Sequence, residues 1–270
     1  MRAQCVLTAL CCLAFHSAQG SEKTTPLVIG ETFTLQSQVL NETRRINVYL
    51  PPGYAEASES RFPVLYMPDG GLAEDFLHVA GLVQVSVGNG TMRRFVLVGI
   101  ENTQRRRDLT GPTQNEEDKK IAPRVGGSAA FRKFLREELM PDVKARYRTT
   151  DETAIVGESL AGLFVVETLL LEPDLFDSYI AIDPSLWWND GALVKSASER
   201  LRAQPKSRKW LWFSSSGEER GDGTERLHAV LQAASGPSGL LWRFEKMPGE
   251  KHSTIYHPAA LMAFRTVFAP

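Results

Sequence analysis

One serine lies in a setting typical of a catalytic nucleophile. Ser159 stands in the stretch AIVGESLAGLF, which spans residues 154–164 and places glycine or alanine at 157, 161 and 162. Small residues around a serine, between a strand and a helix, permit the tight turn that projects a nucleophilic hydroxyl. Alanine replaces the last glycine of the common G-x-S-x-G pattern, so the motif alone is a weak signal. The alternative is an ordinary serine that caps a helix.

A serine hydroxyl needs a general base, which in strand–turn–helix sites follows the serine in the chain. Three histidines follow Ser159. His228 lies in a helical stretch and His257 lies at the start of another helix. His252 lies in the loop after the last predicted strand, 93 residues beyond Ser159 (252 − 159). His252 is therefore the predicted base.

An acid must orient the histidine ring and stabilise the imidazolium. Loops that follow predicted strands offer three candidates, which we rank in the order Glu219, Asp222, Asp183. Each could instead be a solvated loop charge, which is the interpretation we favour for Glu218.

Backbone N–H groups must stabilise the oxyanion that forms on the substrate. One predicted donor is Leu160, the residue after the serine. The other is Gly71, in the sequence MPDGG after an earlier strand, because a residue without a Cβ lets the backbone approach the substrate. A plain glycine turn is the alternative for Gly71.

Elements of two kinds alternate along the chain and would position these residues. Alternating residues before a Pro-Pro-Gly turn predict a strand at 44–54. Short apolar runs predict strands at 62–71, 94–102, 153–159, 178–185, 209–217 and 239–249. Helical periodicity falls at 129–147, with a kink or break at Pro141, and at 160–173, 225–234 and 258–268. This order predicts one α/β domain, with a mostly parallel central sheet and helices on both faces.

The first residues read as a secretory signal peptide. A positive start is followed by CVLTALCCLAF and then by small residues, with cleavage expected after Gly20. A membrane anchor would need about 20 apolar residues, and this run is shorter. We therefore expect residues 1–20 to be the signal, residues 21–270 to be the α/β domain, and the protein to be exported, either periplasmic or secreted.

Composition excludes several classes of function. The formal net charge of −1 gives no electrostatic reason to bind nucleic acid. All 3 cysteines precede residue 21, so the mature chain has neither a thiol nucleophile nor a thiolate metal site. We expect no cofactor, no metal and no membrane anchor in the mature chain. The sequence carries no signal of oligomeric state.

Several motifs together resemble an esterase family with the α/β-hydrolase fold, which includes the catecholate siderophore esterases and, more distantly, feruloyl and acetylxylan esterases. They run from Phe62 to Thr254 and include FPVLYMPDGG, GESLAGLF and GEKHST. The resemblance implies that Ser159 is the nucleophile and His252 its histidine. Glu219 looks like the glutamate that some members carry. Glu158 departs from the family, whose members often have histidine before the serine.

The resemblance also implies a substrate. The segment NTQRRRDLTG resembles the pocket mouth of siderophore esterases, where Arg105 and Arg107 would bind an anionic group. The alternative is a solvated loop with an arginine paired to Asp108. Trp187 and Trp188 would line the pocket against an aromatic acyl group, with core packing as the alternative for at least one of them.

The sequence thus predicts a serine hydrolase that cleaves a small-molecule carboxylic ester, such as a siderophore or aromatic ester, through an acyl-enzyme. An acyltransferase on the same scaffold is the first alternative, since an alcohol can replace water at the acyl-enzyme. A non-catalytic module that binds a ferric siderophore is the second.

Overall fold

The computed structural model describes residues 24–56, 58–204, 207–218, 220–233 and 239–270. The predicted signal peptide lies outside these ranges, so its cleavage stays a prediction. In the described ranges, the helices are too short or too polar for any of them to cross a membrane.

A single eight-stranded sheet forms the centre of the described chain, in the order β1-β2-β4-β3-β5-β6-β7-β8. Two pairings, β1 with β2 and β2 with β4, are antiparallel, and the strands from β4 to β8 run parallel. The strands are β1 (Glu31–Ser37), β2 (Glu42–Tyr49), β3 (Phe62–Pro68), β4 (Val96–Ile100), β5 (Thr149–Glu158), β6 (Ser178–Ile182), β7 (Lys209–Ser216) and β8 (Leu240–Met247).

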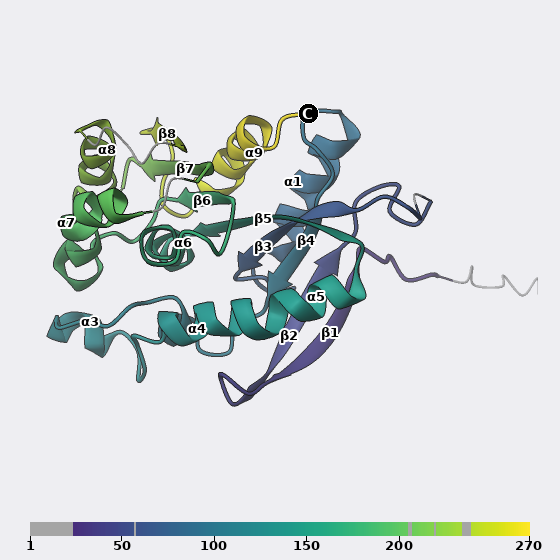
Figure 1. Cartoon of the computed structure of the whole chain (residues 1–270), viewed down its shortest axis with the longest axis horizontal. Coiled ribbons are helices and arrows are strands. Elements are labelled where there is room, and N and C mark those ends of the chain that lie inside the picture. The colour runs from purple at the N-terminus through teal and green to yellow at the C-terminus, as the bar shows by residue number, and fades with distance from the viewer. Residues whose placement is uncertain (1–23, 57, 205–206, 219, 234–238) are drawn as a thin grey trace, which may run out of the picture.

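Helices cover both faces of this sheet, as the sequence predicts (Figure 1). The helices α1 and α9 pack together on one face, and α4, α6, α7 and α8 contribute to the core on the other. The helices are α1 (Phe76–Gly88), α2 (Arg105–Asp108), α3 (Glu116–Lys120), α4 (Ser128–Phe134), α5 (Met140–Arg146), α6 (Leu160–Leu171), α7 (Trp188–Ala203), α8 (Gly223–Ala233) and α9 (Tyr256–Val267), with a π-helical segment at Leu135–Leu139.

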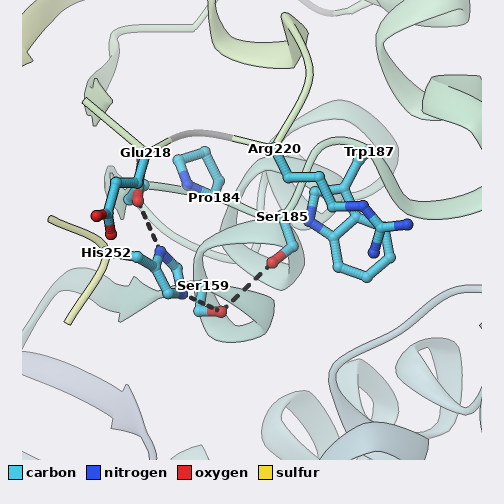
Figure 2. A pocket seen from close by; sticks show the side chains of 8 residues that line it. Ser159, Pro184, Ser185, Trp187, Glu218, Arg220 and His252 are labelled. Carbon is cyan, nitrogen blue, oxygen red and sulfur yellow. Dashed lines mark hydrogen bonds and ion pairs between the residues drawn. The ribbon is translucent and has the colours of Figure 1, made fainter. Parts of the chain in front are cut away.

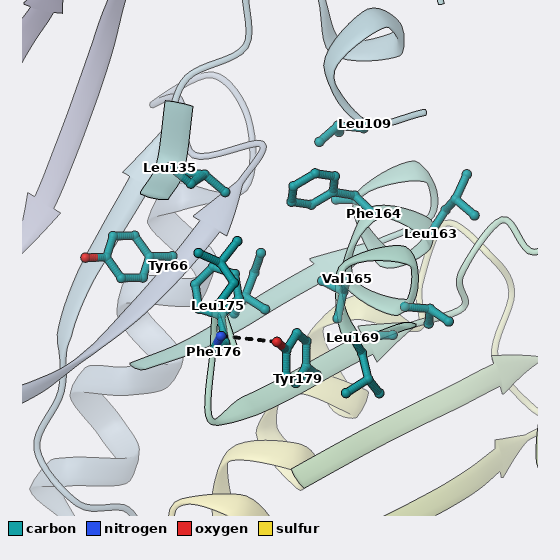
Figure 3. Close-up of a cluster of buried hydrophobic side chains, with 14 of the residues drawn as sticks. Tyr66, Leu109, Leu135, Leu163, Phe164, Val165, Leu169, Leu175, Phe176 and Tyr179 are labelled. Carbon is teal, nitrogen blue, oxygen red and sulfur yellow. Dashed lines mark hydrogen bonds between the residues drawn. The ribbon is translucent and has the colours of Figure 1, made fainter. Parts of the chain in front are cut away.

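The helix that follows the candidate nucleophile is buried on nearly all sides. Residues 160–170 of α6 are all buried, among them Phe164 and Leu169 in the cluster shown in Figure 3. In the same cluster the Tyr179 hydroxyl accepts a hydrogen bond from the backbone N–H of Phe176 at 3.1 Å. Burial of this depth holds the start of α6 rigidly beneath the site.

All seven predicted strands are confirmed, as are the four predicted helical regions. β1 was not predicted, because this edge strand is largely exposed and pairs only with β2. Pro141 does not break the helix: α4, the π-helical segment and α5 follow one another directly, and Pro141 lies in the first turn of α5. An extra residue in the turn before the proline is one way in which a helix accommodates the missing N–H.

Candidate active site

Ser159 occupies a strained turn between β5 and α6. Its backbone has φ 59° and ψ −119°, a region that residues other than glycine seldom adopt. The small neighbours explain how the turn closes: a Cβ on Gly157 would lie 2.6 Å from the Cβ of Ala161, and one on Gly162 would lie 3.0 Å from the carbonyl oxygen of Ile182. The predicted turn geometry is therefore present.

His252 reaches Ser159 from the loop between β8 and α9. The distance from its Nε2 to the Ser159 Oγ is 3.0 Å, which is hydrogen-bond distance. The other two candidate histidines lie elsewhere: His228 packs against Trp242 and Phe244, and His257 lies in the first turn of α9. The structure thus brings together the predicted nucleophile and the predicted base.

Asp183 holds the other side of the histidine ring. It directly follows β6, its side chain is 1% exposed, and its Oδ2 lies 2.6 Å from the His252 Nδ1. The Ser216 backbone N–H and hydroxyl also donate to this carboxylate, each at 2.8 Å. Burial alone would raise the pKa of Asp183, but the hydrogen bonds from His252 and Ser216 outweigh it and lower the pKa. The carboxylate in turn is the main cause that raises the pKa of His252.

The structure describes one of the other two acids ranked from the sequence. Glu219, ranked first, lies outside the described residues. Asp222 is 73% exposed and faces Arg226 at 3.7 Å. Because Asp183 already occupies the Nδ1 of His252, the geometry favours the acid that the sequence ranked third. The signal that could have found it is an aspartate directly after a fully buried strand, next to proline.

The two predicted oxyanion donors differ in their surroundings. Leu160 is the first residue of α6, and the N–H groups of the first helical turn have no carbonyl partner within the helix. The Gly71 N–H instead donates to the Glu74 Oε2 at 2.7 Å. Glu74 would have to move before Gly71 could bind an oxyanion, and only the Leu160 donor is supported by the geometry.

A pocket of about 270 Å³ opens beside Ser159 (Figure 2). Trp187 forms one wall, and the guanidinium carbon of Arg220 lies 4.3 Å from the centre of its ring. The hydroxyl of Ser185 lies 3.4 Å from the Ser159 Oγ. The sequence did not single out Arg220 or Ser185, because nothing local marks a loop arginine or serine as part of a pocket.

Trp188 does not line this pocket. Its side chain is 4% exposed, and its Nε1 donates to the carbonyl oxygen of Gly111 at 2.9 Å. Its neighbour Trp187 lines the pocket, and the two ring planes lie at 58° to one another, with their centres 6.1 Å apart. The prediction that Trp188 contacts the substrate therefore gives way to its alternative, core packing.

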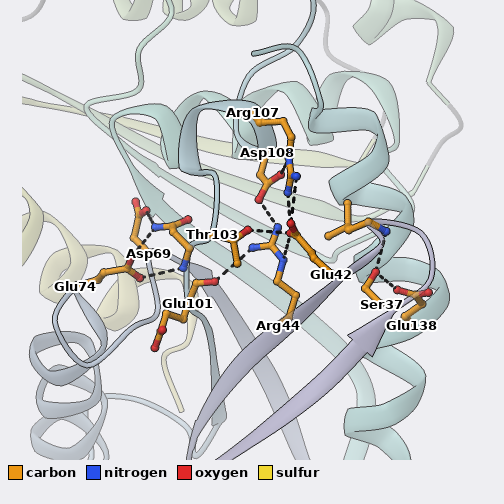
Figure 4. A network of polar contacts seen from close by, with 12 residues as sticks. Ser37, Glu42, Arg44, Asp69, Glu74, Glu101, Thr103, Arg107, Asp108 and Glu138 are labelled. Carbon is orange, nitrogen blue, oxygen red and sulfur yellow. Dashed lines mark hydrogen bonds and ion pairs between the residues drawn. The ribbon is translucent and has the colours of Figure 1, made fainter. Parts of the chain in front are cut away.

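Arg105 and Arg107 both have carboxylate partners. Arg105 binds Asp69 through two hydrogen bonds of 2.6 and 2.8 Å. Arg107 binds Glu42 at 2.7 Å and Asp108 at 2.6 Å. Glu42 and Asp108 also form ion pairs with the fully buried Arg44, so Arg107 belongs to a network around Arg44 (Figure 4).

These arginines line a separate surface pocket of about 420 Å³ together with Arg106 and Arg124. For Arg107, the predicted alternative of a pair with Asp108 is what the structure shows. Arg105 is the closer of the two to the site, since its charge acts on Glu158 and His252.

The fold and the site together define a class of protein. A mostly parallel sheet with a serine at a strained strand-to-helix turn, linked through histidine to an aspartate at the end of the neighbouring strand, is the arrangement of α/β-hydrolases. The chain belongs to the family described as "Putative esterase", whose model matches residues 37–259. The protein is thus an ester hydrolase, and the family resemblance seen in the sequence is confirmed.

Characterised relatives include two siderophore esterases. The ferri-bacillibactin esterase BesA of Bacillus subtilis is 26% identical over 258 residues, which cover 85% of this chain and 87% of that protein. The siderophore triacetylfusarinine C esterase of Aspergillus fumigatus is 29% identical over 191 residues, or 64% of this chain and 61% of that one. The crystal structure of an IroE-like serine hydrolase from Shewanella oneidensis has a TM-score of 0.80 at 28% identity and covers 88% of this chain and 80% of its own.

Proposed function

We propose that this protein is a serine esterase in which Ser159 is the nucleophile, His252 the general base and Asp183 the acid that orients it. The observation that carries this proposal is the continuous chain of hydrogen bonds, 3.0 Å from Ser159 to His252 and 2.6 Å from His252 to Asp183, beside an open pocket. A non-catalytic binding module has no need of this alignment.

The geometry supports the following reaction. The Ser159 Oγ attacks the ester carbonyl while the His252 Nε2 takes its proton, and the carboxylate of Asp183 stabilises the imidazolium through Nδ1. The Leu160 N–H donates to the oxyanion of the tetrahedral intermediate. The imidazolium then protonates the leaving alcohol, and water releases the acid from the acyl-enzyme by the same steps.

A fluorophosphonate probe tests the nucleophile directly, because it reacts with a serine that a histidine activates. We expect one covalent adduct, which peptide mass spectrometry places on Ser159. The Ser198→Ala variant, which removes a half-buried hydroxyl of α7, is expected to label like the parent. An adduct elsewhere, or no adduct with the folded protein, would remove Ser159 from this role.

For the substrate, we propose an ester with an aromatic, anionic acyl group, with a catecholate siderophore lactone as the leading case. The stack of Arg220 on Trp187 offers a flat apolar surface with a positive charge beside it. A pocket of about 270 Å³ lies just below the usual range of ligand pockets, roughly 300–1,000 Å³, and suits one arm of a lactone. The siderophore esterases among the relatives support the same class of substrate.

Arg220→Ala is expected to lower kcat/KM for a tri-catechol lactone about tenfold, because a charge-assisted hydrogen bond contributes ~1.5–3 kcal/mol. Hydrolysis of p-nitrophenyl acetate, which is neutral and short, is expected to change little. Steady-state kinetics on both esters measure the difference. Arg243→Ala, which removes an exposed arginine of β8, is the matched control.

Equal losses on the two esters would show that Arg220 acts through the shape of the site and not through substrate charge. An enzyme that cleaves p-nitrophenyl acetate but no tri-catechol lactone would remove the siderophore assignment and leave a general carboxylesterase.

A further inference from the structure

A second carboxylate lies against the candidate catalytic histidine. Glu158 is the last residue of β5 and directly precedes Ser159. Side chains two apart on a strand share a face, so Glu158 points the same way as Val156, which belongs to the core beneath α1 and α9. Its side chain is only 15% exposed. A carboxyl placed this deep beside the nucleophile calls for a partner.

That partner is the reacting nitrogen of His252. The Glu158 Oε1 lies 3.3 Å from the His252 Nε2, and the Ser159 Oγ lies 3.0 Å from the same atom. Nε2 carries either one proton or one lone pair. When it is protonated, the Glu158 carboxylate can hold that proton as an ion pair. When it is deprotonated, its lone pair faces the Ser159 hydroxyl and can act as a base.

The titratable and charged groups around Glu158 include Asp69 after β3, Arg105 of α2, Asp183 after β6, His252 and the neutral Tyr256 of α9. Burial is the largest influence and raises the pKa of Glu158 to about 7, while His252 and Arg105 act in the opposite direction. Glu158 in turn raises the pKa of His252, after the larger contribution of Asp183. Two titratable groups in contact share protons as a pair.

We propose that Glu158 is a positioning residue that competes with Ser159 for the His252 Nε2 and thereby sets the pH at which the enzyme becomes active. Below that pH the pair keeps its proton on Nε2, held toward Glu158, and His252 cannot accept the Ser159 proton. Above it the proton leaves the pair and Nε2 becomes available as a base. The expected change in the pH profile of activity rests on the proposed function. The expected change in the protonation of His252 rests on its contact with Glu158 and does not require catalysis.

Glu158→Gln keeps the shape of the side chain and removes its charge. A carboxylate favours the imidazolium, so its loss lowers the pKa of His252, and the acid limb of the kcat/KM profile is expected to move down by about one pH unit. At a pH well below the parental limb, the variant is then expected to keep a fraction of its maximum kcat/KM about ten times larger than the fraction that the parent keeps. Glu245→Gln, which removes a carboxylate of β8 paired with Arg243, is expected to leave the profile unchanged.

Titration of the His252 ring by NMR, in parent and variant on a Ser159→Ala background, tests the same pair without catalysis. The His252 resonances are assigned by their loss in His252→Gln. A fall of about one unit in the pKa of His252 in Glu158→Gln supports the proposal even if no ester is turned over. An unchanged pKa, or a uniform loss of activity with an unmoved acid limb, would overturn it and make Glu158 a structural residue. Should the glutamine variant not fold, Glu158→Asp retracts the carboxylate by one methylene and is expected to give a shift of the same sign and smaller size.

Discussion

Replacing Ser159 by alanine is expected to lower kcat for any ester by at least ~10³-fold, because removal of a triad nucleophile leaves only the oxyanion donors and substrate binding. The loss should fall on kcat, since the pocket walls formed by Trp187 and Arg220 remain. The fold should tolerate the change. The Ser159 side chain is half-buried, and within the described ranges its hydroxyl is hydrogen-bonded to the site residues His252 and Ser185.

Steady-state hydrolysis of p-nitrophenyl acetate measures this loss, and thermal unfolding shows that the variant is folded. Alanine could relieve backbone strain at the turn only slightly, because it also has a Cβ at φ 59°. Ser198→Ala on α7 is the matched hydroxyl deletion and should retain parental kcat. Activity of Ser159→Ala within tenfold of the parent would refute the nucleophile and the acyl-enzyme.

Asp183→Asn is expected to cost up to ~10⁴-fold in kcat, because an amide in place of the carboxylate stabilises the wrong tautomer of the histidine. The carboxylate of Asp183 is the largest cause of the raised pKa of His252. Its removal should therefore also lower that pKa and move the acid limb of the remaining activity to lower pH. The combination of a large loss and a moved limb separates Asp183 from Glu158, for which we expect the limb to move with little loss at the plateau.

Amide variants of the other two candidate acids, Asp222 and Glu219, are compared with Asp183→Asn. Asp222→Asn removes an exposed carboxylate of the loop before α8 and should leave kcat within a few-fold of the parent. Glu219→Gln tests the acid that the sequence ranked first. If Glu219→Gln costs orders of magnitude while Asp183→Asn stays near parental activity, the assignment of the acid to Asp183 fails.

Local patterns were sufficient to predict much of the architecture. Seven of the eight strands of the described chain were predicted from local patterns. Several of them are short apolar runs, because strands buried on both faces need apolar side chains at every position, as in β3. The turn at Ser159 was likewise predictable, since its need for small residues at 157, 161 and 162 is a property of a few consecutive residues. His252 followed from its loop after the last strand.

The partner of His252 depended on which strands are neighbours. Asp183 follows β6, and β6 pairs with β5 so that Glu158 lies opposite Ile182. That pairing places Asp183 beside Ser159, although 24 residues separate them along the chain (183 − 159). A sequence shows that an acid follows a strand, but the order of strands in the sheet comes from long-range packing.

The ion pairs likewise depend on tertiary structure, although the sequence identifies the charged residues. The sequence identified Arg105 and Arg107 as cations by type and segment. The tertiary structure supplies the distant partners Asp69, which follows β3, and Glu42, at the start of β2. Glu158 was visible as an unusual neighbour of the nucleophile, but its contact with the His252 Nε2 depends on a loop that follows β8. The sequence by itself predicted most of the strands, the candidate nucleophile and the candidate base, because these depend on residue type and local periodicity. Only the tertiary structure decided which charges meet, because side chains from four strand ends converge where the parallel sheet places its carboxyl edge.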